Sequence, residues 1–343
     1  MPHYYTILNL TVCLLSDNLW FLDEFYKDYR CFKQTWNTEI PCDINIDLKD
    51  HLLQINEKCI DISDHPSPMH FAFQVVVSEI MSQLNDYYLI HAGVVQKDEH
   101  VIVLSGPPGI GKSTLVKTLV NNGFHFFSDD CAPLHKQSGM ISPFPRSMWI
   151  VDKQNYSCSI RSKKNIPVTC TFDINTSVKP TTIICLIDDT STSQPIQLNV
   201  SLKSHDSKFI KELKQFPDFQ CIKRHSLHAE YRIQYHASET NTKVIQAAMI
   251  KYKKDLWTMY RVPPKRECFE RKAKIKAVPT HQAAAEIISE MKMFESAFNP
   301  SFVEAPMATL INISKHIKDA DCFIMSAGYL SSEIELIARV LNT

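Results

Sequence analysis

The stretch LSGPPGIGKSTLVKTLVNNGFHFFSDDCAPL, residues 104–134, decides how this chain of 343 residues is interpreted. It begins with a glycine-rich loop and ends just after two adjacent aspartates, Asp129 and Asp130. An apolar segment leads into the loop, and a helical pattern follows from Lys112 to about Asn122, with Gly123 placed to end the helix. This order of strand, loop and helix predicts an α/β chain built around the loop.

The loop matches the phosphate-binding pattern G-x-x-x-x-G-K-[ST] through Gly106, Gly111, Lys112 and Ser113. The chain has only seven glycines, yet three of them lie within these six residues, 106–111. Glycines let backbone N–H groups turn inward around a phosphate, and the N-terminus of the following helix adds partial positive charge. We expect Lys112 to reach the β- and γ-phosphates and Ser113 to hold Mg²⁺. The predicted nucleotide-binding set is Gly106, Pro107, Pro108, Gly109, Ile110, Gly111, Lys112, Ser113 and Thr114.

GTPases, ATPases and kinases all use such a loop, so further sequence motifs are needed to distinguish between these classes of enzyme. A GTPase would need a guanine-reading N/T-K-x-D segment, which the sequence lacks. An ATPase would need a Walker B strand, and IICLIDD at 183–189 offers Asp188 or Asp189, but no glutamate or glutamine of obvious role follows. Asp129 and Asp130 follow the short apolar segment FHFF, next to the phosphate loop in a sheet of this type. Phosphoryl transfer to a hydroxyl needs a base and a metal ligand, and two adjacent carboxylates can divide these roles.

Four segments in this order and spacing resemble the catalytic core of HPr kinase/phosphorylase: LIHAGVV, GPPGIGKST, GFHFFSDD and PFPRS. They are closer still to the HPr-kinase-related serine kinases of bacterial gene clusters, including peptide-modification clusters. The resemblance covers about 88–150 and is loose beyond. It implies a P-loop kinase core of the HPr-kinase/PEP-carboxykinase-like type, which uses ATP and Mg²⁺ to phosphorylate a serine of a peptide or small protein. It assigns Asp129 as general base, Asp130 as the acidic neighbour near the metal, and His91 beside the phosphates or the base.

Arg146, in the segment FPRS, is a candidate to neutralise charge on the transferring phosphoryl group. Two departures limit the resemblance. Thr114 stands where HPr kinases have a glutamate after the lysine and serine of the loop, and their later R-G-L-G-I segment has no counterpart. We therefore do not extend the resemblance to the reverse phosphorylase reaction or to HPr as acceptor. The family tendency to self-associate is compatible with a homo-oligomer.

The bulk composition is that of an ordinary folded protein, with 22% charged residues and a formal net charge of zero. It indicates neither nucleic acid nor membrane as a partner, and no apolar run approaches the roughly 18 residues of a membrane span. Eleven cysteines at irregular spacing, without a C-x-x-C pair, favour reduced thiols and a cytoplasmic location. HSLHAEYRIQYH, with His225, His228 and His236, lacks a persuasive ligand set for a metal.

The chain divides, on this interpretation, into a small N-terminal α/β subdomain at 1–66 and a kinase domain at 67–343. The breaker cluster SDHPSP at 63–68 places the boundary. Residues 251–276 carry ten basic residues against three acidic ones, either a solvated face or a surface for an acidic acceptor. Helical spacing is expected within 69–88, 280–297 and 331–342, and single strands at YLIHAGVV and HVIVLSG.

Three functions remain open at this point. The first is an ATP-dependent kinase for a seryl hydroxyl on a peptide or small carrier protein. The second is a kinase of the same fold whose acceptor is a free amino acid or sugar. The third is a non-catalytic ATP-binding sensor or scaffold. The size of the labelled acceptor, and whether any acceptor is labelled, separates them.

Overall fold

The protein, seen here as a computed structural model, is a mixed α/β chain with several sheets. The structure describes residues 1–35, 40–65, 67–151, 163–166, 173–187, 195–202, 207–223, 229–236, 238–252, 256–262, 272–295 and 306–341. It forms two units. The first contains Met1–Gly106, Gly111–Ile187 and Ala273–Thr343, and the second contains Pro107–Ile110 and Asp188–Lys272.

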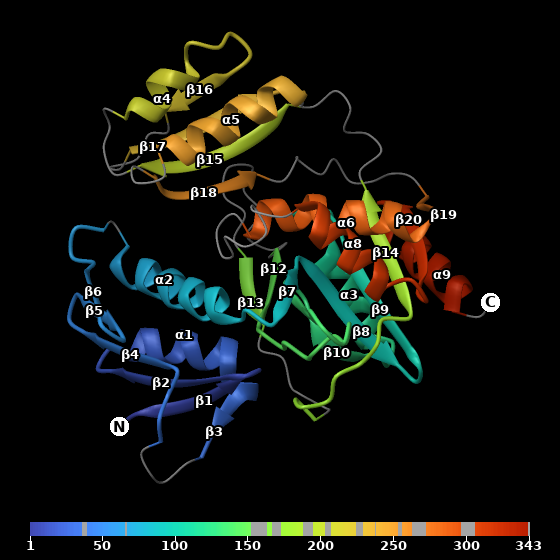
Figure 1. Cartoon of the computed structure of the whole chain (residues 1–343), viewed down its shortest axis with the longest axis horizontal. Helices are drawn as coiled ribbons and strands as arrows, with labels where there is room; N and C mark the ends of the chain where they lie inside the picture. The colour runs from blue at the N-terminus through green and yellow to red at the C-terminus, as the bar shows by residue number, and fades with distance from the viewer. Residues whose placement is uncertain are drawn as a thin grey trace. The chain divides into compact units, whose positions relative to one another are not determined.

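The strand that leads into the phosphate loop, β9, lies inside a six-stranded sheet of the first unit (Figure 1). The strand order is β10-β8-β9-β14-β20-β19. Strands β9, β14 and β20 run parallel, and the other neighbouring pairs are antiparallel. The bounds are β8 Ala92–Lys97, β9 His100–Ser105, β10 His125–Ser128, β14 Thr182–Ile187, β19 Lys274–Ala277 and β20 Asp321–Ser326. The carboxyl ends of the three parallel strands therefore share one edge, where α/β sheets bind ligands.

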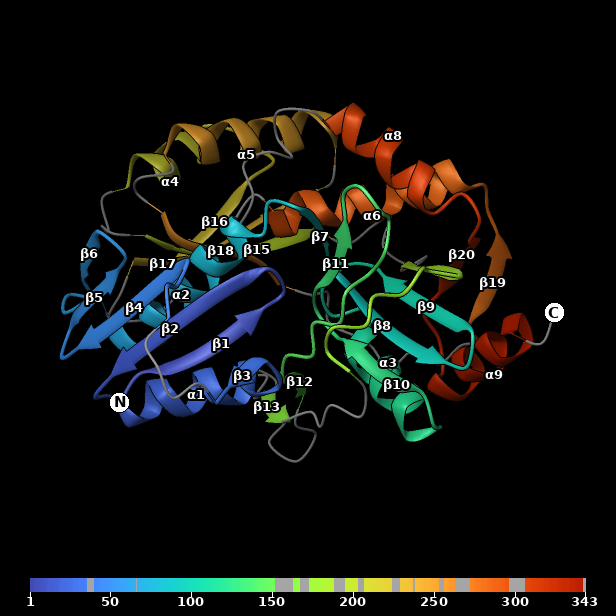
Figure 2. The ribbon, with the colours of Figure 1, turned by 60° about the horizontal axis from the view of Figure 1, so that its bottom comes forward.

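Four helices cover this sheet: α3 Lys112–Asn121, α6 Thr280–Glu295, α8 Pro306–His316 and α9 Leu330–Leu341. Figure 2 shows α6 and α8 on one side of the sheet and α3 and α9 on the other. The strands are apolar on both faces because both faces are covered: residues 101–104 of β9 are all buried. Small residues of α6, Ala283 and Ala284, let that helix approach the strands closely.

The N-terminal residues form a second six-stranded sheet, in the order β3-β1-β2-β4-β5-β6. Its strands are β1 His3–Ile7, β2 Leu10–Ser16, β3 Lys33–Gln34, β4 Ile44–Lys49, β5 Leu52–Ile55 and β6 Lys58–Asp61. Helices α1, Leu19–Tyr29, and α2, Pro68–Gln83, pack against this sheet. A short 3₁₀ helix, η1 Arg30–Phe32, follows α1. The core of this region extends to Leu89, Cys131 and Phe144, so the N-terminal sheet shares its core with the segment that carries the motifs.

Two small sheets complete the first unit. Strand β7, Tyr87–Ile90, pairs with β11, Ala132–His135, and β12, Met148–Val151, pairs with β13, Lys163–Ile166. The second unit has a core of its own, around an antiparallel sheet of order β16-β17-β15-β18. Its elements are β15 Ile196–Leu202, α4 Lys208–Leu213, β16 Gln220–Lys223, β17 Ala229–Tyr235, α5 Glu239–Lys251 and β18 Leu256–Val262.

One expected strand is divided. The sequence predicts YLIHAGVV as a single strand, but it breaks at His91 into β7 and β8, which belong to different sheets. The reason is the choice of pairing partner: Ile90 pairs with Ala132 of β11, whereas Ala92 pairs with Ser105 of β9. The predicted boundary at residue 66 stays a prediction.

The cysteines differ in one place from the expectation of reduced thiols. Seven of those described form no disulfide, whereas Cys31 is disulfide-bonded. In the described part of the chain, no helix is both long and apolar enough to cross a bilayer.

Candidate functional site

The two aspartates predicted to share the chemistry lie in different environments. Both follow β10, whose Phe126 and Phe127 are buried and fix the end of the strand. Asp129 is buried, with 7% of its surface exposed. The side chain of Asp130 is 59% exposed. One carboxylate is therefore sheltered from water and the other is open to it, and their roles as base and metal ligand stay predictions.

His91 contacts the second of these aspartates. It lies at the break between β7 and β8, and its Nε2 is 3.1 Å from Asp130 Oδ1. The contact follows from the sheet, because β10 pairs with β8 and brings the residues after Ser128 beside the start of β8. His91 is itself buried, at 8% exposed. A half-exposed carboxylate is thus held by a sheltered imidazole.

The charges around Asp130 favour its ionised form. Desolvation by the surrounding protein raises its pKa, but the hydrogen bond and charge of His91, followed by the charges of Arg146 and Lys112, outweigh this effect. The net result holds the pKa of Asp130 well below its usual range. Because more than half of the side chain faces water, solvent screens these interactions. Asp130 is therefore an anion at neutral pH, as a Mg²⁺ ligand must be.

The phosphate loop has the backbone that an anion cradle needs. Gly109 and Gly111 have φ values of 81° and 108°, which residues with a side chain rarely adopt. Gly111 caps the N-terminus of α3, so the helix dipole adds partial positive charge at this end. The Lys112 ammonium donates to the carbonyl of Gly106 at 2.5 Å and is almost fully buried. The N-terminus of α3 therefore suits an anion, and the assignment of Lys112 to phosphate oxygens stays a prediction.

Pro107–Ile110 belongs to the second unit, and within it the Ile110 N–H donates to the Pro107 carbonyl at 3.2 Å. The assignment of Pro107, Pro108, Gly109 and Ile110 to a nucleotide stays a prediction. In the first unit, the buried hydroxyl of Ser105 has no hydrogen-bond partner among the described residues. It is a polar atom at the base of the loop that the sequence did not single out.

Arg146 lies in a setting that the sequence did not predict. Its guanidinium forms a salt bridge with Asp28 of α1, through Nε at 3.1 Å and through Nη2. The guanidinium carbon lies 5.4 Å from the ring centre of Tyr29. Ser147 also donates to Asp28. A signal for Asp28 existed in the sequence, because it falls on the apolar face of α1 together with Phe21, Phe25 and Tyr29.

Several of the remaining candidates lie outside the described residues. Asp188 and Asp189 lie outside them, as do His225, His228 and five of the ten basic residues of 251–276, namely Lys253, Lys254, Lys265, Arg266 and Arg271. Within the described ranges, no three histidine, cysteine, aspartate or glutamate side chains come together as metal ligands. The assignment of Ser113 and Asp130 to a magnesium ion stays a prediction.

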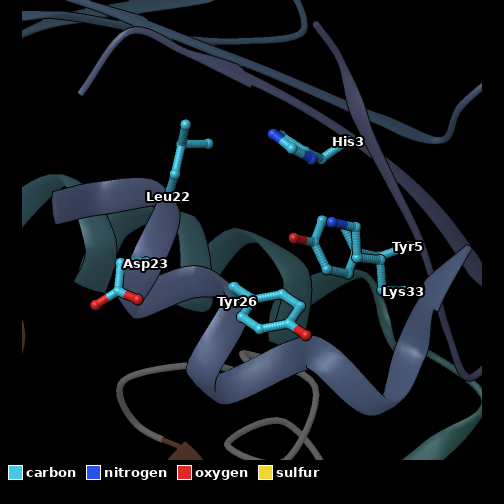
Figure 3. Close-up of a pocket in the computed structure, with 6 residues that line it drawn as sticks. All are labelled: His3, Tyr5, Leu22, Asp23, Tyr26 and Lys33. Carbon is cyan, nitrogen blue, oxygen red and sulfur yellow. The ribbon is translucent and has the colours of Figure 1, made fainter. Parts of the chain in front are cut away.

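A pocket with a cavity volume of about 250 Å³ lies between β1, β3 and α1 (Figure 3). His3, Tyr5, Leu22, Asp23, Tyr26 and Lys33 line it. The Lys33 ammonium lies 5.1 Å from the ring centre of Tyr26, and burial followed by the charge of Lys33 lowers the pKa of His3. None of these six residues belongs to the predicted nucleotide site, so we do not include the pocket in that site.

Comparisons with known proteins add little to this geometry. No protein-family model matches the chain, and no curated protein does. Among solved structures, the HPr(Ser) kinase/phosphatase from Coxiella burnetii matches 49% of this chain and 97% of its own chain. The sequence identity is 13% and the TM-score is 0.22. A superposition this weak carries no argument about fold or activity, so a function for this chain has to be inferred from its motifs and its geometry.

Proposed function

We propose that the protein is a kinase that transfers the γ-phosphate of Mg-ATP to a serine hydroxyl of a peptide or small protein. The observation that carries the proposal is the pairing of a buried carboxylate, Asp129, with an open one, Asp130, that His91 contacts. Lys112 belongs to the same charged group, because its charge acts on Asp130. The order of the motifs, which resembles HPr-kinase-related serine kinases, supports serine as the acceptor.

Each group has a distinct role in this chemistry. The serine oxygen attacks the γ-phosphorus, the new O–P bond forms as the bond from the γ-phosphorus to the bridging oxygen breaks, and ADP leaves with that oxygen. Asp129 accepts the proton of the hydroxyl. Lys112 and the N-terminus of α3 offset the charge of the phosphates. Mg²⁺, held by Ser113 and Asp130, would supply further charge neutralisation. His91 keeps the Asp130 carboxylate oriented.

The test is transfer from γ-labelled ATP to cell extract fractionated by size, with wild type beside Asp129→Asn. Loss of the base should lower transfer by about 10²- to 10⁴-fold. ATP binding should stay within about threefold, because Asp129 acts on the acceptor proton. Asp98→Asn is the matched control, since Asp98 lies in the β8–β9 turn with φ of 51°, a conformation that asparagine accepts.

The labelled fraction distinguishes the three functions. A peptide or protein band that disappears in Asp129→Asn supports the proposal and identifies the acceptor. Label in the low-mass fraction would instead indicate an amino-acid or sugar kinase. Tight ATP binding without any transfer would indicate a sensor. Transfer by Asp129→Asn at the wild-type rate would overturn the mechanism.

A further inference from the structure

Asp28 is the most deeply buried acidic side chain near the candidate site. It lies in the last turn of α1 with 2% of its side chain exposed. Two nitrogens of Arg146 donate to Oδ2, and the Ser147 hydroxyl donates to Oδ1. A buried carboxylate without such partners would be strongly unfavourable. Both of its oxygens are therefore committed to the segment that follows the candidate acids.

The guanidinium of Arg146, which pairs with Asp28, contacts other residues through its ring-facing side and through two of its three nitrogens. The guanidinium carbon of Arg146 lies over the Tyr29 ring, 5.4 Å from its centre, and Nε and Nη2 donate to Asp28. The remaining nitrogen, Nη1, forms no hydrogen bond with any residue that the structure describes. A guanidinium is a rigid planar fork, so fixing two of its nitrogens fixes the direction of the third.

Arg146 lies close in the fold to the candidate acids. The Phe144 N–H donates to the Phe127 carbonyl at 2.9 Å, so the segment that carries Arg146 runs beside the end of β10, from which Asp129 and Asp130 follow. Burial alone would lower the pKa of Arg146, but the contact with Tyr29, the charge and hydrogen bond of Asp28 and the charge of Asp130 raise it, so the group stays cationic. A cation thus lies in the segment beside the end of the strand that both candidate acids follow.

We propose that Asp28 is a positioning residue that holds Arg146 so that its free Nη1 points at the phosphoryl group being transferred. This inference rests on the proposed function. It gives the N-terminal sheet and its helices a role in the reaction, because α1 supplies the carboxylate without which the arginine has no fixed direction. Asp28 touches neither nucleotide nor acceptor and acts only through Arg146.

The ion pair between Asp28 and Arg146 is better suited to fixing the direction of the guanidinium than to stabilising the fold. Replacing a buried ion pair by apolar residues of similar volume is often neutral or stabilising, so the pair by itself is weak evidence for a stabilising role. The two-nitrogen contact adds direction, which a lysine could not provide.

A double-mutant cycle in the full chain tests the proposal. Asp28→Asn should lower kcat about 10²-fold, as expected when a catalytic group is displaced by about 1 Å, and leave the KM for ATP within about threefold. In the Arg146→Ala background, Asp28→Asn should change kcat no further. Asp23→Asn, an exposed carboxylate on the same helix that pairs with Lys27, is the control and should retain wild-type kcat.

A second variant covers the case in which Asp28→Asn does not fold. Arg146→Lys keeps a cation beside Asp28 but loses the fork, so it should fold and lose about as much kcat as Asp28→Asn. Wild-type kcat in Arg146→Lys, or additive losses in the cycle, would overturn the proposal.

A third measurement does not depend on transfer. The Nε–H of Arg146 should give a slowly exchanging NMR signal in wild type, and added Mg-ATP should shift it. The signal should be lost in Asp28→Asn and kept in Asp23→Asn. If wild type transfers no phosphate but this signal behaves as expected, the proposed function fails while the anchoring of Arg146 stands. If the signal survives in Asp28→Asn, the anchoring fails whatever the activity.

Discussion

At the scale of single residues, the contact between His91 and Asp130 is where the candidate site is most open to test. Asp130 is 59% exposed, so water would leave its carboxylate free to rotate without the Nε2 contact at 3.1 Å. Residues that orient a metal ligand typically contribute about 10- to 100-fold to metal affinity or activity. We predict that His91→Ala lowers the apparent affinity for Mg²⁺ by about that factor, measured as the Mg²⁺ concentration at half-maximal transfer.

The control is His100→Ala. His100 also faces a carboxylate, with Nε2 3.9 Å from Glu99, but both side chains are open to water at the start of β9. Its removal should leave the Mg²⁺ dependence unchanged. Equal Mg²⁺ dependence in wild type and His91→Ala would show that His91 does not orient the Asp130 carboxylate. The assignment of His91 to the site would then be wrong.

How much of the site could be predicted depended on the distance in sequence between the residues. The phosphate loop is a local pattern, and its glycine conformations are those that the residue types imply. The pairing of Arg146 with Asp28 joins residues 118 positions apart, and no local pattern encodes it. The position of Asp28 on an apolar helix face signalled that it has a buried partner, but not which one.

At the scale of elements, the close packing of α3 against β8 determines the position of this helix, which follows the phosphate loop. Gly93 of β8 faces α3, and a Cβ at this position would collide with Cγ2 of Val116 and come within 3.5 Å of the Asp129 carbonyl oxygen. We predict that Gly93→Ala lowers the free energy of unfolding by about 1–3 kcal/mol, the cost of overpacking a core. Denaturant unfolding of the full chain measures it.

The matched change is Val116→Ala, which removes the methyl group in the way. On its own it should destabilise by leaving a small cavity. In the Gly93→Ala background it should restore stability, giving a coupling free energy of about 1 kcal/mol or more. Additive effects would mean that the strand yields elsewhere and that Gly93 does not set the approach of α3.

Elements with a strong local signal agree with their prediction. Helices α3, α6 and α9 lie within one or two residues of the helical patterns at 112–122, 280–297 and 331–342. The break at His91 was not predictable in this way, because Ile90 and Ala92 are both buried and apolar. Only the pairing partners, β11 for one strand and β9 for the other, separate them.

At the scale of the whole molecule, the second unit has no counterpart among the boundaries that the sequence predicts. Residues 188–272 carry a core of their own, yet they are inserted between β14 and β19 of the central sheet. Sheet membership depends on pairing between distant strands, whereas alternation of apolar residues is a local property. For this reason β14 and β15, which follow one another along the chain, could not be assigned to different sheets in advance.

The strand pairing in the central sheet brings the two ends of the inserted segment, 188–272, close together, so we expect that a short linker can replace it. Ile187 at the end of β14 and Lys274 at the start of β19 both pair with Ser326 of β20. The two ends therefore stand about 10 Å apart, two strand spacings, which roughly three extended residues can span. We predict that replacing Asp188–Lys272 by a flexible linker of about eight residues leaves the first unit folded.

The expected result is a cooperative unfolding transition and hydrogen-exchange protection in β9, β14 and β20, because every described residue of the buried cluster around these strands belongs to the first unit. The matched control replaces residues 44–55 by the same linker. That deletion removes β4 and β5 from the N-terminal sheet, whose core reaches Phe144, and it should abolish protection there. Loss of protection in β14 and β20 on deletion of 188–272 would mean instead that the central sheet needs the inserted unit in order to fold.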